Sequence, residues 1–185
     1  MELLRLPRGI EDAPGCEDLI GQLASRSSPL WKEGPGKEGP GKEGKEKEAH
    51  ALAVEAELGP ALRSALRSAF SAGRIVRGLE SAQQSLAAEQ RGLAHVDQKT
   101  GVERGGRVSR LVVLSNDGSE RFYRNVEGLL RQHAPRVLAM RLASDEHQLG
   151  ELVCGQGRAR LLMVAHKKAV SDALQALAGQ WSDAT

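Results

Sequence analysis

The sequence predicts an α/β fold, a three-layer α/β/α sandwich around a small mixed sheet of four strands. Three observations support this class. Short apolar runs alternate with segments of helical periodicity along residues 50–185, which is the order expected of an α/β domain. The inner strand runs are apolar at every position, so helices should cover both faces of the sheet. The stretch is also long enough to enclose one hydrophobic core.

Residues 1–30 are predicted to form a poorly ordered extension. One short helix is expected within it, from Cys16 to Ala24, because Leu19 and Leu23 share a face with Ile20. Prolines on either side limit anything longer.

Residues 31–49 are predicted to be a flexible linker. A Lys-Glu-Gly-Pro-Gly unit at 32–36 repeats at 37–41, and no apolar residue occurs from 32 to 48. Without apolar burial, nothing offsets the entropy of ordering such a segment. We therefore expect residues 50–185 to fold without the first 48 residues.

The first helix of the domain is predicted from apolar residues that repeat every four positions. Pro60 is compatible with the first turn of such a helix, and Gly73 should end it. The repeating residues are Leu58, Leu62, Leu66 and Phe70.

A strand-to-helix junction follows, and it is the main candidate site. The β-branched pair at 75–76 lies between Gly73 and Gly78, and a helical pattern then runs to about Glu89. The first N–H groups of that helix have no partner within it, so they favour an anion such as a phosphate. Leu79, Ala82 and Leu86 carry the helical spacing.

Residues 90–109 are predicted to be an exposed loop. They contain four glycines and no apolar periodicity. The cations in and beside this stretch are Arg91, Lys99, Arg104, Arg107 and Arg110.

The remaining elements alternate regularly to the end of the chain. A buried strand is predicted at 111–114 and is followed by a helix that Ser119 can cap. A third strand is expected at 137–142, and then a short helix capped by Ser144 or Asp145 that stops at Gly155. The last two elements are a strand from Ala159 to Ala165 and a helix from Lys168 to Trp181.

The charge of the chain is unevenly divided. The formal net charge is +2, yet residues 1–50 hold 8 Lys and Arg against 10 Asp and Glu. The rest holds 18 cations against 14 anions, a net charge of +4, and 15 of those cations are Arg. Arginine suits phosphate groups because its planar fork donates paired hydrogen bonds. The modest net charge argues against a protein coated with nucleic acid.

The sequence favours the cytosol or nucleus. Cys16 and Cys154 are the only cysteines and lie far apart, so neither a disulfide framework nor a zinc site is indicated. No apolar run approaches the roughly 20 residues of a membrane helix. Arg5 and Arg8 interrupt the apolar start of the chain, and nearby acidic residues do not fit a transit peptide.

No catalytic, cofactor or metal site is predicted, and the chain is not expected to be an enzyme. The five histidines lie far apart, and none pairs with a cysteine or carboxylate at metal-ligand spacing. No phosphate-binding loop or dinucleotide fingerprint occurs. The segments 116–118 and 155–158 are interpreted as turns.

The order of these elements resembles the ribosomal L-seven-Ae/L-thirty-e superfamily, small α/β/α proteins that mostly bind kink-turn RNA. Within it, the sequence most resembles the S-twelve branch of the eukaryotic small ribosomal subunit. The likeness covers residues 58–182. It is carried by 61–69 (ALRSALRSA), by 75–86, by 114–116 with Tyr123 and 126–129, and by the Leu-Gly-Glu-Leu-Val segment at 149–153 with Gly155.

The sequence departs from the family pattern at the junction. Kink-turn binders usually carry Arg-Gly-x-Asn-Glu and a Lys three residues later. Here Arg77 and Gly78 are present, but Glu80 and Gln84 stand where the Asn and the Lys are expected. Residues 90–109 are an insertion relative to the family, and the first 50 residues match nothing in it.

The resemblance implies a structural constituent of the cytosolic small ribosomal subunit, a cytoplasmic protein that transits the nucleolus. Its expected partners are ribosomal RNA and neighbouring ribosomal proteins, with no membrane, cofactor or small-molecule substrate. The helix start would meet the RNA backbone, and the glutamines would reach base edges or sugars. The expected RNA-binding residues are Arg74, Arg77, Gly78, Leu79, Glu80, Ser81, Gln83, Gln84, Arg107 and Arg110.

A non-ribosomal member of the same superfamily is the alternative. Such a protein would be an RNA-binding subunit of a processing particle, or a protein-interaction module like the growth-arrest Gadd branch. Sedimentation distinguishes these hypotheses, because a ribosomal protein migrates with small subunits and an interaction module stays in light fractions.

Overall fold

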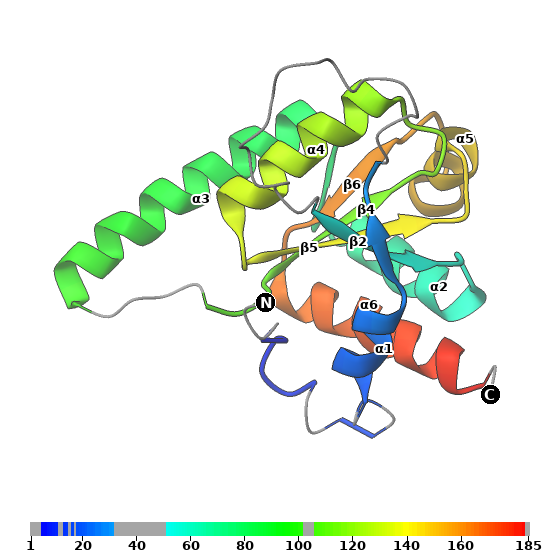
Figure 1. The fold of residues 1–185 in the computed structure, drawn as a ribbon, viewed down its shortest axis with the longest axis horizontal. Helices are drawn as coiled ribbons and strands as arrows, with labels where there is room; N and C mark the ends of the chain where they lie inside the picture. The colour runs from blue at the N-terminus through cyan, green and yellow to red at the C-terminus, as the bar shows by residue number, and fades with distance from the viewer. Residues whose placement is uncertain are drawn as a thin grey trace, which may run out of the picture.

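A mixed sheet forms the middle layer of the fold, as seen in a computed structural model that describes residues 5–10, 13–14, 16, 18–31, 51–101 and 106–183. The strands in this part of the chain are β1 (Ser27–Pro29), β2 (Leu52–Ala56), β3 (Ile75–Arg77), β4 (Arg110–Leu114), β5 (Val137–Leu142) and β6 (Leu161–Val164). Their order across the sheet is β1-β2-β5-β4-β6-β3 (Figure 1). β2, β5 and β4 are parallel neighbours, whereas β1, β6 and β3 pair antiparallel.

Helices cover both faces of this sheet. They are α1 (Leu19–Ser25), α2 (Pro60–Ser71), α3 (Leu79–Thr100), α4 (Glu120–His133), α5 (Glu146–Leu149) and α6 (Lys167–Ser182), and a π-helical turn, η1 (Gly150–Cys154), continues α5. Figure 1 shows α3 and α4 above the strands and α1 and α6 below them. The predicted α/β/α layering is therefore present.

The central strand β4 divides the core into two clusters. Its side chains alternate between the faces, and Leu111, Val112, Val113 and Leu114 are all 0% exposed. Leu111 and Val113 pack with residues of α1, α2 and α6, whereas Val112 and Leu114 pack with residues of α3 and α4. A strand buried on both faces is what the continuous apolar run predicted.

Several predicted helix ends are confirmed by their capping contacts. Pro60 is the first residue of α2. The Ser119 hydroxyl accepts a hydrogen bond from the Phe122 N–H at 3.2 Å and caps α4. Asp145 forms a reciprocal capping box with Gln148 at the start of α5. The strand at 137–142 also forms at the predicted residues.

The predicted count of four strands is wrong, because β1 and β2 extend the sheet to six. β1 pairs antiparallel with β2 through Ser28 and Ala53, and β2 runs parallel to β5. Neither strand has the long apolar alternation from which strands are predicted. β1 is the three-residue segment Ser-Ser-Pro, and β2 leads directly into the helix pattern at Leu58.

The expected disorder of residues 1–30 is also wrong for the described part of that segment. Most of its apolar residues lie in the core of the domain, and the helix starts at Leu19, three positions later than predicted. Because the domain buries side chains from before residue 31, its boundary is not at residue 50. The side chains that are at most 1% exposed are Leu6, Ile10, Leu19, Leu23 and Leu30.

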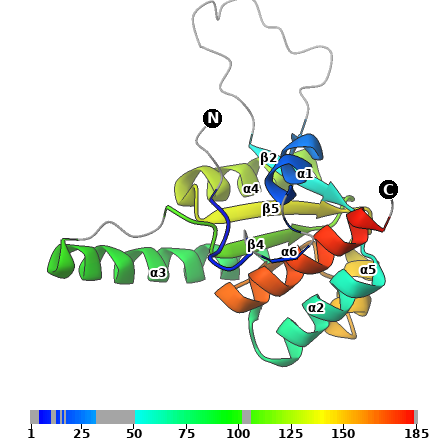
Figure 2. The ribbon, with the colours of Figure 1, turned by 90° about the horizontal axis from the view of Figure 1, so that it is seen from below.

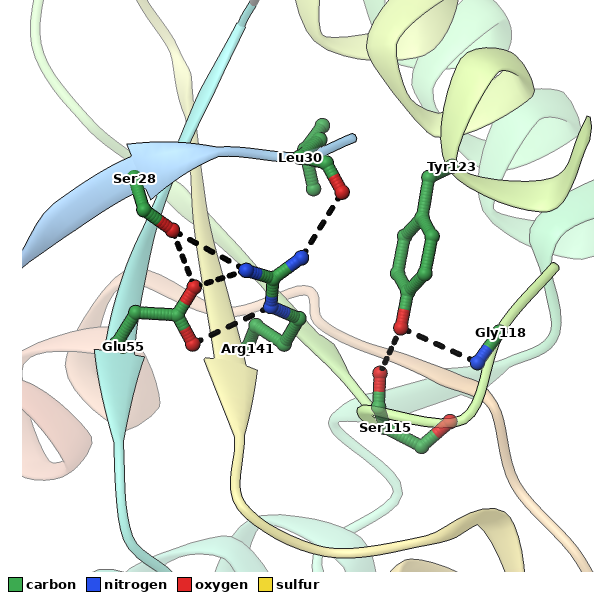
Figure 3. A network of polar contacts seen from close by, with 7 residues as sticks. All are labelled: Ser28, Leu30, Glu55, Ser115, Gly118, Tyr123 and Arg141. Atoms are coloured by element: carbon green, nitrogen blue, oxygen red, sulfur yellow. Dashed lines mark hydrogen bonds and ion pairs between the residues drawn. The ribbon is translucent and has the colours of Figure 1, made fainter. Parts of the chain in front are cut away.

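Arg141 on β5 fastens β1 to the sheet (Figure 3). Its guanidinium donates to the Leu30 carbonyl oxygen at 2.9 Å, to the Ser28 hydroxyl at 3.1 Å and to both carboxylate oxygens of Glu55 on β2. The Ser28 hydroxyl donates to the same carboxylate. One charged side chain thus joins three neighbouring strands.

Tyr123 on α4 lies beside this network and fixes the loop after β4 (Figure 3). Its ring lies 5.6 Å from the Arg141 guanidinium carbon. Its hydroxyl donates to the Ser115 carbonyl oxygen at 2.7 Å and accepts from the Gly118 N–H at 3.2 Å. The loop that follows the buried strand β4 is therefore held in place by α4.

Glu127 of α4 contacts Trp31 and Ala51, the two residues that flank segment 32–50. One carboxylate oxygen accepts from the Trp31 indole N–H at 2.8 Å, and the other accepts from the Ala51 backbone N–H at 2.7 Å. Two residues that are 20 positions apart in the sequence are thus held by one side chain. The predicted linker lies outside the described residues, apart from Trp31 at its start.

The predicted loop at 90–109 is wrong over its first half. α3 continues to Thr100, and Gly101 ends it in the left-handed conformation with φ 65°. The residues from 87 to 99 are mostly strong helix formers such as Ala, Glu, Gln, Leu and Lys. They sustain the helix without an apolar stripe. Figures 1 and 2 show the far half of α3 extending beyond the sheet.

We predict that Leu23→Ala lowers the free energy of unfolding by about 2–4 kcal/mol, because it opens a cavity under α1. Leu23 is 1% exposed, whereas Ile20 on the same helix is 40% exposed. Ile20→Ala is therefore the matched control and should cost less than about 1 kcal/mol. Urea denaturation of both variants measures the difference. Equal, negligible effects would place the N-terminal segment outside the folded unit.

Candidate nucleic-acid interface

One edge of the sheet gathers the ends of several strands. β4 and β5 finish at this edge, β6 begins there, and the antiparallel strand β3 finishes there, since Arg77 pairs with Leu162 and Leu114 pairs with Leu161. The start of α3 therefore lies against the turn before β6. That turn in turn contacts the loop after β4, because the Ser115 N–H donates to the Arg160 carbonyl oxygen at 3.0 Å. Open α/β sheets commonly place binding sites at such an edge.

The strand-to-helix junction has a backbone that only glycine adopts readily. Gly78 has φ 92° and ψ 153°, and its N–H donates to the Leu161 carbonyl oxygen at 2.9 Å. A Cβ atom at this position would have no neighbour within 4 Å. Gly78 is the N-cap of α3 and has no side chain that could cap the first turn. The junction thus presents uncapped N–H groups next to open space, which suits an anion.

The turn at 155–158 lies against this junction. The Arg77 guanidinium donates to the Arg158 carbonyl oxygen. Gly157 has φ 76°, and a Cβ atom there would lie 2.8 Å from the Arg77 Nη2 atom. The glycine therefore lets Arg77 cross the turn. The sequence identified these residues as a turn but did not indicate that it adjoins the junction.

Two further arginines reach the same edge. Arg160 Nε lies 2.7 Å from one Glu146 oxygen, and Arg158 Nη1 lies 3.6 Å from the other. Their side chains are 49% and 65% exposed, whereas that of Glu146 is 14% exposed. Two exposed guanidinium groups thus share one recessed carboxylate. The alternation of Arg158, buried Ala159 and Arg160 was the available signal in the sequence.

Asp117 is an acidic support within the loop after β4. Its carboxylate accepts from the Glu146 backbone N–H at 3.2 Å and so ties the loop to the start of α5. Burial alone would raise the pKa of Asp117, but hydrogen bonds, including this one, and the charge of Arg160 hold the pKa below its ordinary value. Asp117 therefore stays charged and belongs to the framework of the edge.

Most of the predicted site residues lie together at the junction. Glu80, Ser81, Gln83 and Gln84 are exposed along the first turns of α3, and Leu79 is half-buried against the sheet. Together with Arg77, Gly78 and the turn residues Gly157, Arg158 and Arg160, they form what we call the junction face.

Arg74 does not belong to the junction face. It lies before β3, where its carbonyl oxygen accepts from the Ala165 N–H at 2.8 Å. About 10 Å of extended strand separates it from Arg77. Its side chain lines a groove between α2 and α6.

Arg107 and Arg110 lie at the opposite edge of the sheet and are held by other groups. Arg110 and Arg136 each contact a different oxygen of Glu89 at 2.9 Å, and their side chains are only 14% and 13% exposed. Arg107 donates to the Leu6 carbonyl oxygen at 3.0 Å. Arg107 and Arg110 therefore do not belong to the junction, because Glu89 lies about three turns along α3 from Gly78 and holds Arg110 at the start of β4.

Among the described residues, no group of three or more His, Cys, Asp or Glu side chains is arranged to hold a metal ion. A search of the described helices found none both long and apolar enough to cross a membrane.

Two solved structures show a weak likeness to the chain. No protein-family model and no curated protein matches the chain. A 15.5 kD RNA-binding protein of Giardia lamblia has a TM-score of 0.43 and 13% identity, over 68% of this chain and 88% of that one. A protein of unknown function from Bacillus halodurans has a TM-score of 0.41 and 19% identity, over 64% and 96%. Neither likeness is strong enough to assign a function.

We predict that Glu89→Gln lowers the free energy of unfolding by about 2 kcal/mol, because two largely buried arginines lose their shared anion. Glu80→Gln on the same helix removes an exposed charge and should cost less than about 1 kcal/mol. Guanidinium denaturation compares the two. If the two substitutions have the same small effect, Arg110 and Arg136 do not depend on Glu89.

We also predict that His133 makes the fold less stable in mild acid. Burial, together with the charge of Arg136, holds the pKa of His133 below its ordinary value, against the opposing charge of Glu89. Between that lowered pKa and about 6.5 the unfolded chain binds more protons. The contribution of His133 to the free energy of unfolding is thus fully present above about pH 6.5 and decreases as the pH drops below that value. Thermal melts from pH 7.5 to 5 should show a smaller loss for His133→Gln.

Proposed function

We propose that the chain binds RNA through the junction face. The observation that carries the proposal is the meeting of an uncapped helix start at Gly78 with three arginines, Arg77, Arg158 and Arg160. Backbone N–H groups and arginine forks are the donors that phosphate groups favour. Gln83 and Gln84 lie one turn further along α3, where they would reach bases or sugars of a bound strand.

We propose, more specifically, a member of the L-seven-Ae/L-thirty-e superfamily that is a constituent of the small ribosomal subunit, of the S-twelve type. The ordered motifs from residue 58 to 182 support this assignment. The role would be architectural and non-catalytic, in the cytoplasm, with ribosomal RNA and neighbouring ribosomal proteins as partners.

A protein-interaction module is the second candidate. The observation in its favour is that acidic residues lie among the arginines at this edge of the sheet. They are Glu80, Asp117 and Glu146. Glu80 and Gln84 also replace two residues of the usual kink-turn signature. As a subunit of an RNA-processing particle, the chain would bind RNA through the same surface as it would in a ribosome. The RNA-binding proposal therefore covers both kinds of particle.

Sedimentation of the tagged full chain through a sucrose gradient, with and without ribonuclease, tests the assignment. A small-subunit constituent should migrate with small subunits and shift when the RNA is digested. Migration in a lighter, ribonuclease-sensitive particle would instead assign it to RNA processing. A position in the light fractions that ribonuclease does not change would support the interaction module.

We predict that Arg158→Ser/Arg160→Ser weakens RNA binding and flattens its salt dependence by about 1.5 units of log–log slope, since two phosphate contacts are lost. Fluorescence anisotropy with a 20-nucleotide single strand and a 20-base-pair RNA duplex measures the slope.

The matched control is Arg91→Ser/Lys99→Ser, which removes the same charge from the far half of α3. Equal slopes for the two double variants would contradict a role of the junction face. Arginine variants are preferable to Gly78→Val, because the φ of 92° at Gly78 would strain any other residue.

A further inference from the structure

The outward face of α2 carries positive charge that no acidic residue of the helix balances. Arg63 and Arg67 are both exposed, and α2 contains no Asp or Glu from Pro60 to Ser71. Neither guanidinium makes a hydrogen bond or an ion pair with any residue that the structure describes. Arg63 is also close to the positive end of the helix dipole, which stabilises anions rather than cations.

Most other arginines of the described chain are engaged, which makes this face distinctive. Glu89 holds two of them, Glu55 holds Arg141, and Glu146 contacts the pair at the junction face. The fold thus pairs many of its arginines with carboxylates, whereas Arg63 and Arg67 on α2 have no such partner among the described residues.

The surface beside these arginines is hollowed. A groove of about 440 Å³ between α2 and α6 is lined by Ser64, Ser68 and Arg74, among others. A second hollow of about 410 Å³ runs along α2 and shares both serines with the first, with Arg63 and Arg67 on its wall. Figure 2 shows α2 and α6 side by side. Hydroxyl donors therefore lie between the helix arginines and Arg74.

The one carboxylate in the groove lining is already paired. Asp172 of α6 contacts the Lys168 ammonium at 2.9 Å and 3.0 Å. The Arg74 side chain makes no contact of this kind with a described residue. The groove and the α2 arginines thus keep a net positive charge.

We propose that this surface, which we call the α2 face (Arg63, Ser64, Arg67, Ser68 and Arg74), binds the phosphodiester backbone of RNA as a second contact region. The inference rests on the proposed RNA-binding function. Residues four apart on a helix have Cβ atoms about 5–6 Å apart. For comparison, each strand of B-form DNA advances about 3.4 Å per phosphate along the axis. Arg63 and Arg67 can therefore contact phosphates one or two steps apart on one strand.

The position of the α2 face relative to the junction face supports one ligand for both. α2 packs directly on η1, and the turn that follows η1 carries Gly157 and Arg158. Arg74 and Arg77 lie at the two ends of the short edge strand β3. An RNA bound at the junction face would thus extend over β3 or η1 onto α2.

The test compares salt dependence in the full chain. Arg63→Ser/Arg67→Ser/Arg74→Ser should flatten the log–log slope by about 2 units on the 20-nucleotide single strand and by nearly 3 on the RNA duplex. Arg8→Ser/Arg91→Ser/Lys99→Ser is the charge-matched control from other exposed positions and should change the slope by less than half as much. Arg63→Ser/Arg67→Ser alone serves if Arg74→Ser impairs folding, with two-thirds of the effect expected.

The outcomes separate this proposal from the function on which it rests. Equal slopes for the α2 triple and its control would overturn the α2 face, while a flattened slope for the Arg158/Arg160 variant would keep the junction face. No RNA binding by the unmodified chain at low salt would overturn both. Poly-glutamate is also added as a competitor at a charge concentration equal to that of the RNA. If it displaces RNA from the unmodified chain but not from the α2 triple variant, the proposal is overturned in favour of an acidic protein partner.

Discussion

The burial of β4 on both faces is the constraint on which the rest of the fold depends. Four consecutive side chains with no exposed surface require a helical layer on each side, and α3 with α4 and α1 with α2 and α6 supply those layers. Because β4 and β5 are parallel, their carboxyl ends coincide at one edge, and the antiparallel strands β6 and β3 bring a turn and a helix start to that same edge. The location of the junction face is thus a consequence of how the sheet encloses its central strand.

The distribution of ion pairs divides the arginines into structural and available groups. Glu55, Glu89 and Glu127 each accept hydrogen bonds from distant parts of the chain. They thereby attach β1 and α3 to the sheet, and Trp31 and Ala51 to α4. The arginines that contact Glu89 and Glu55 are largely withdrawn from solvent, since Arg110, Arg136 and Arg141 are only 14%, 13% and 21% exposed. The arginines of the junction face and of α2 are exposed, and the proposed contacts use them.

The sequence predicts those parts of this fold that local chemistry decides. The apolar run of β4 and the caps at Ser119 and Asp145 follow from short-range rules of burial and hydrogen bonding, and the structure confirms them. β1 was not predictable in this way, because a Ser-Ser-Pro strand is stabilised by a distant guanidinium on β5. The candidate site shows the same division. The glycine at the junction can be recognised from the sequence alone. The contact of the turn at 155–158 with the junction and the ion pair between Arg110 and Glu89 could not be predicted, because they depend on sheet order and helix length.

The central claim is that RNA lies along one continuous side of the molecule, from α2 across the junction face. Ultraviolet cross-linking of the full chain to RNA, followed by mass spectrometry of the peptides, tests it most directly. The account predicts cross-links in the peptides that contain residues 63–84 and 155–160. Cross-links confined to the far half of α3 or to residues 106–110, where Arg110 is held by Glu89, would contradict it.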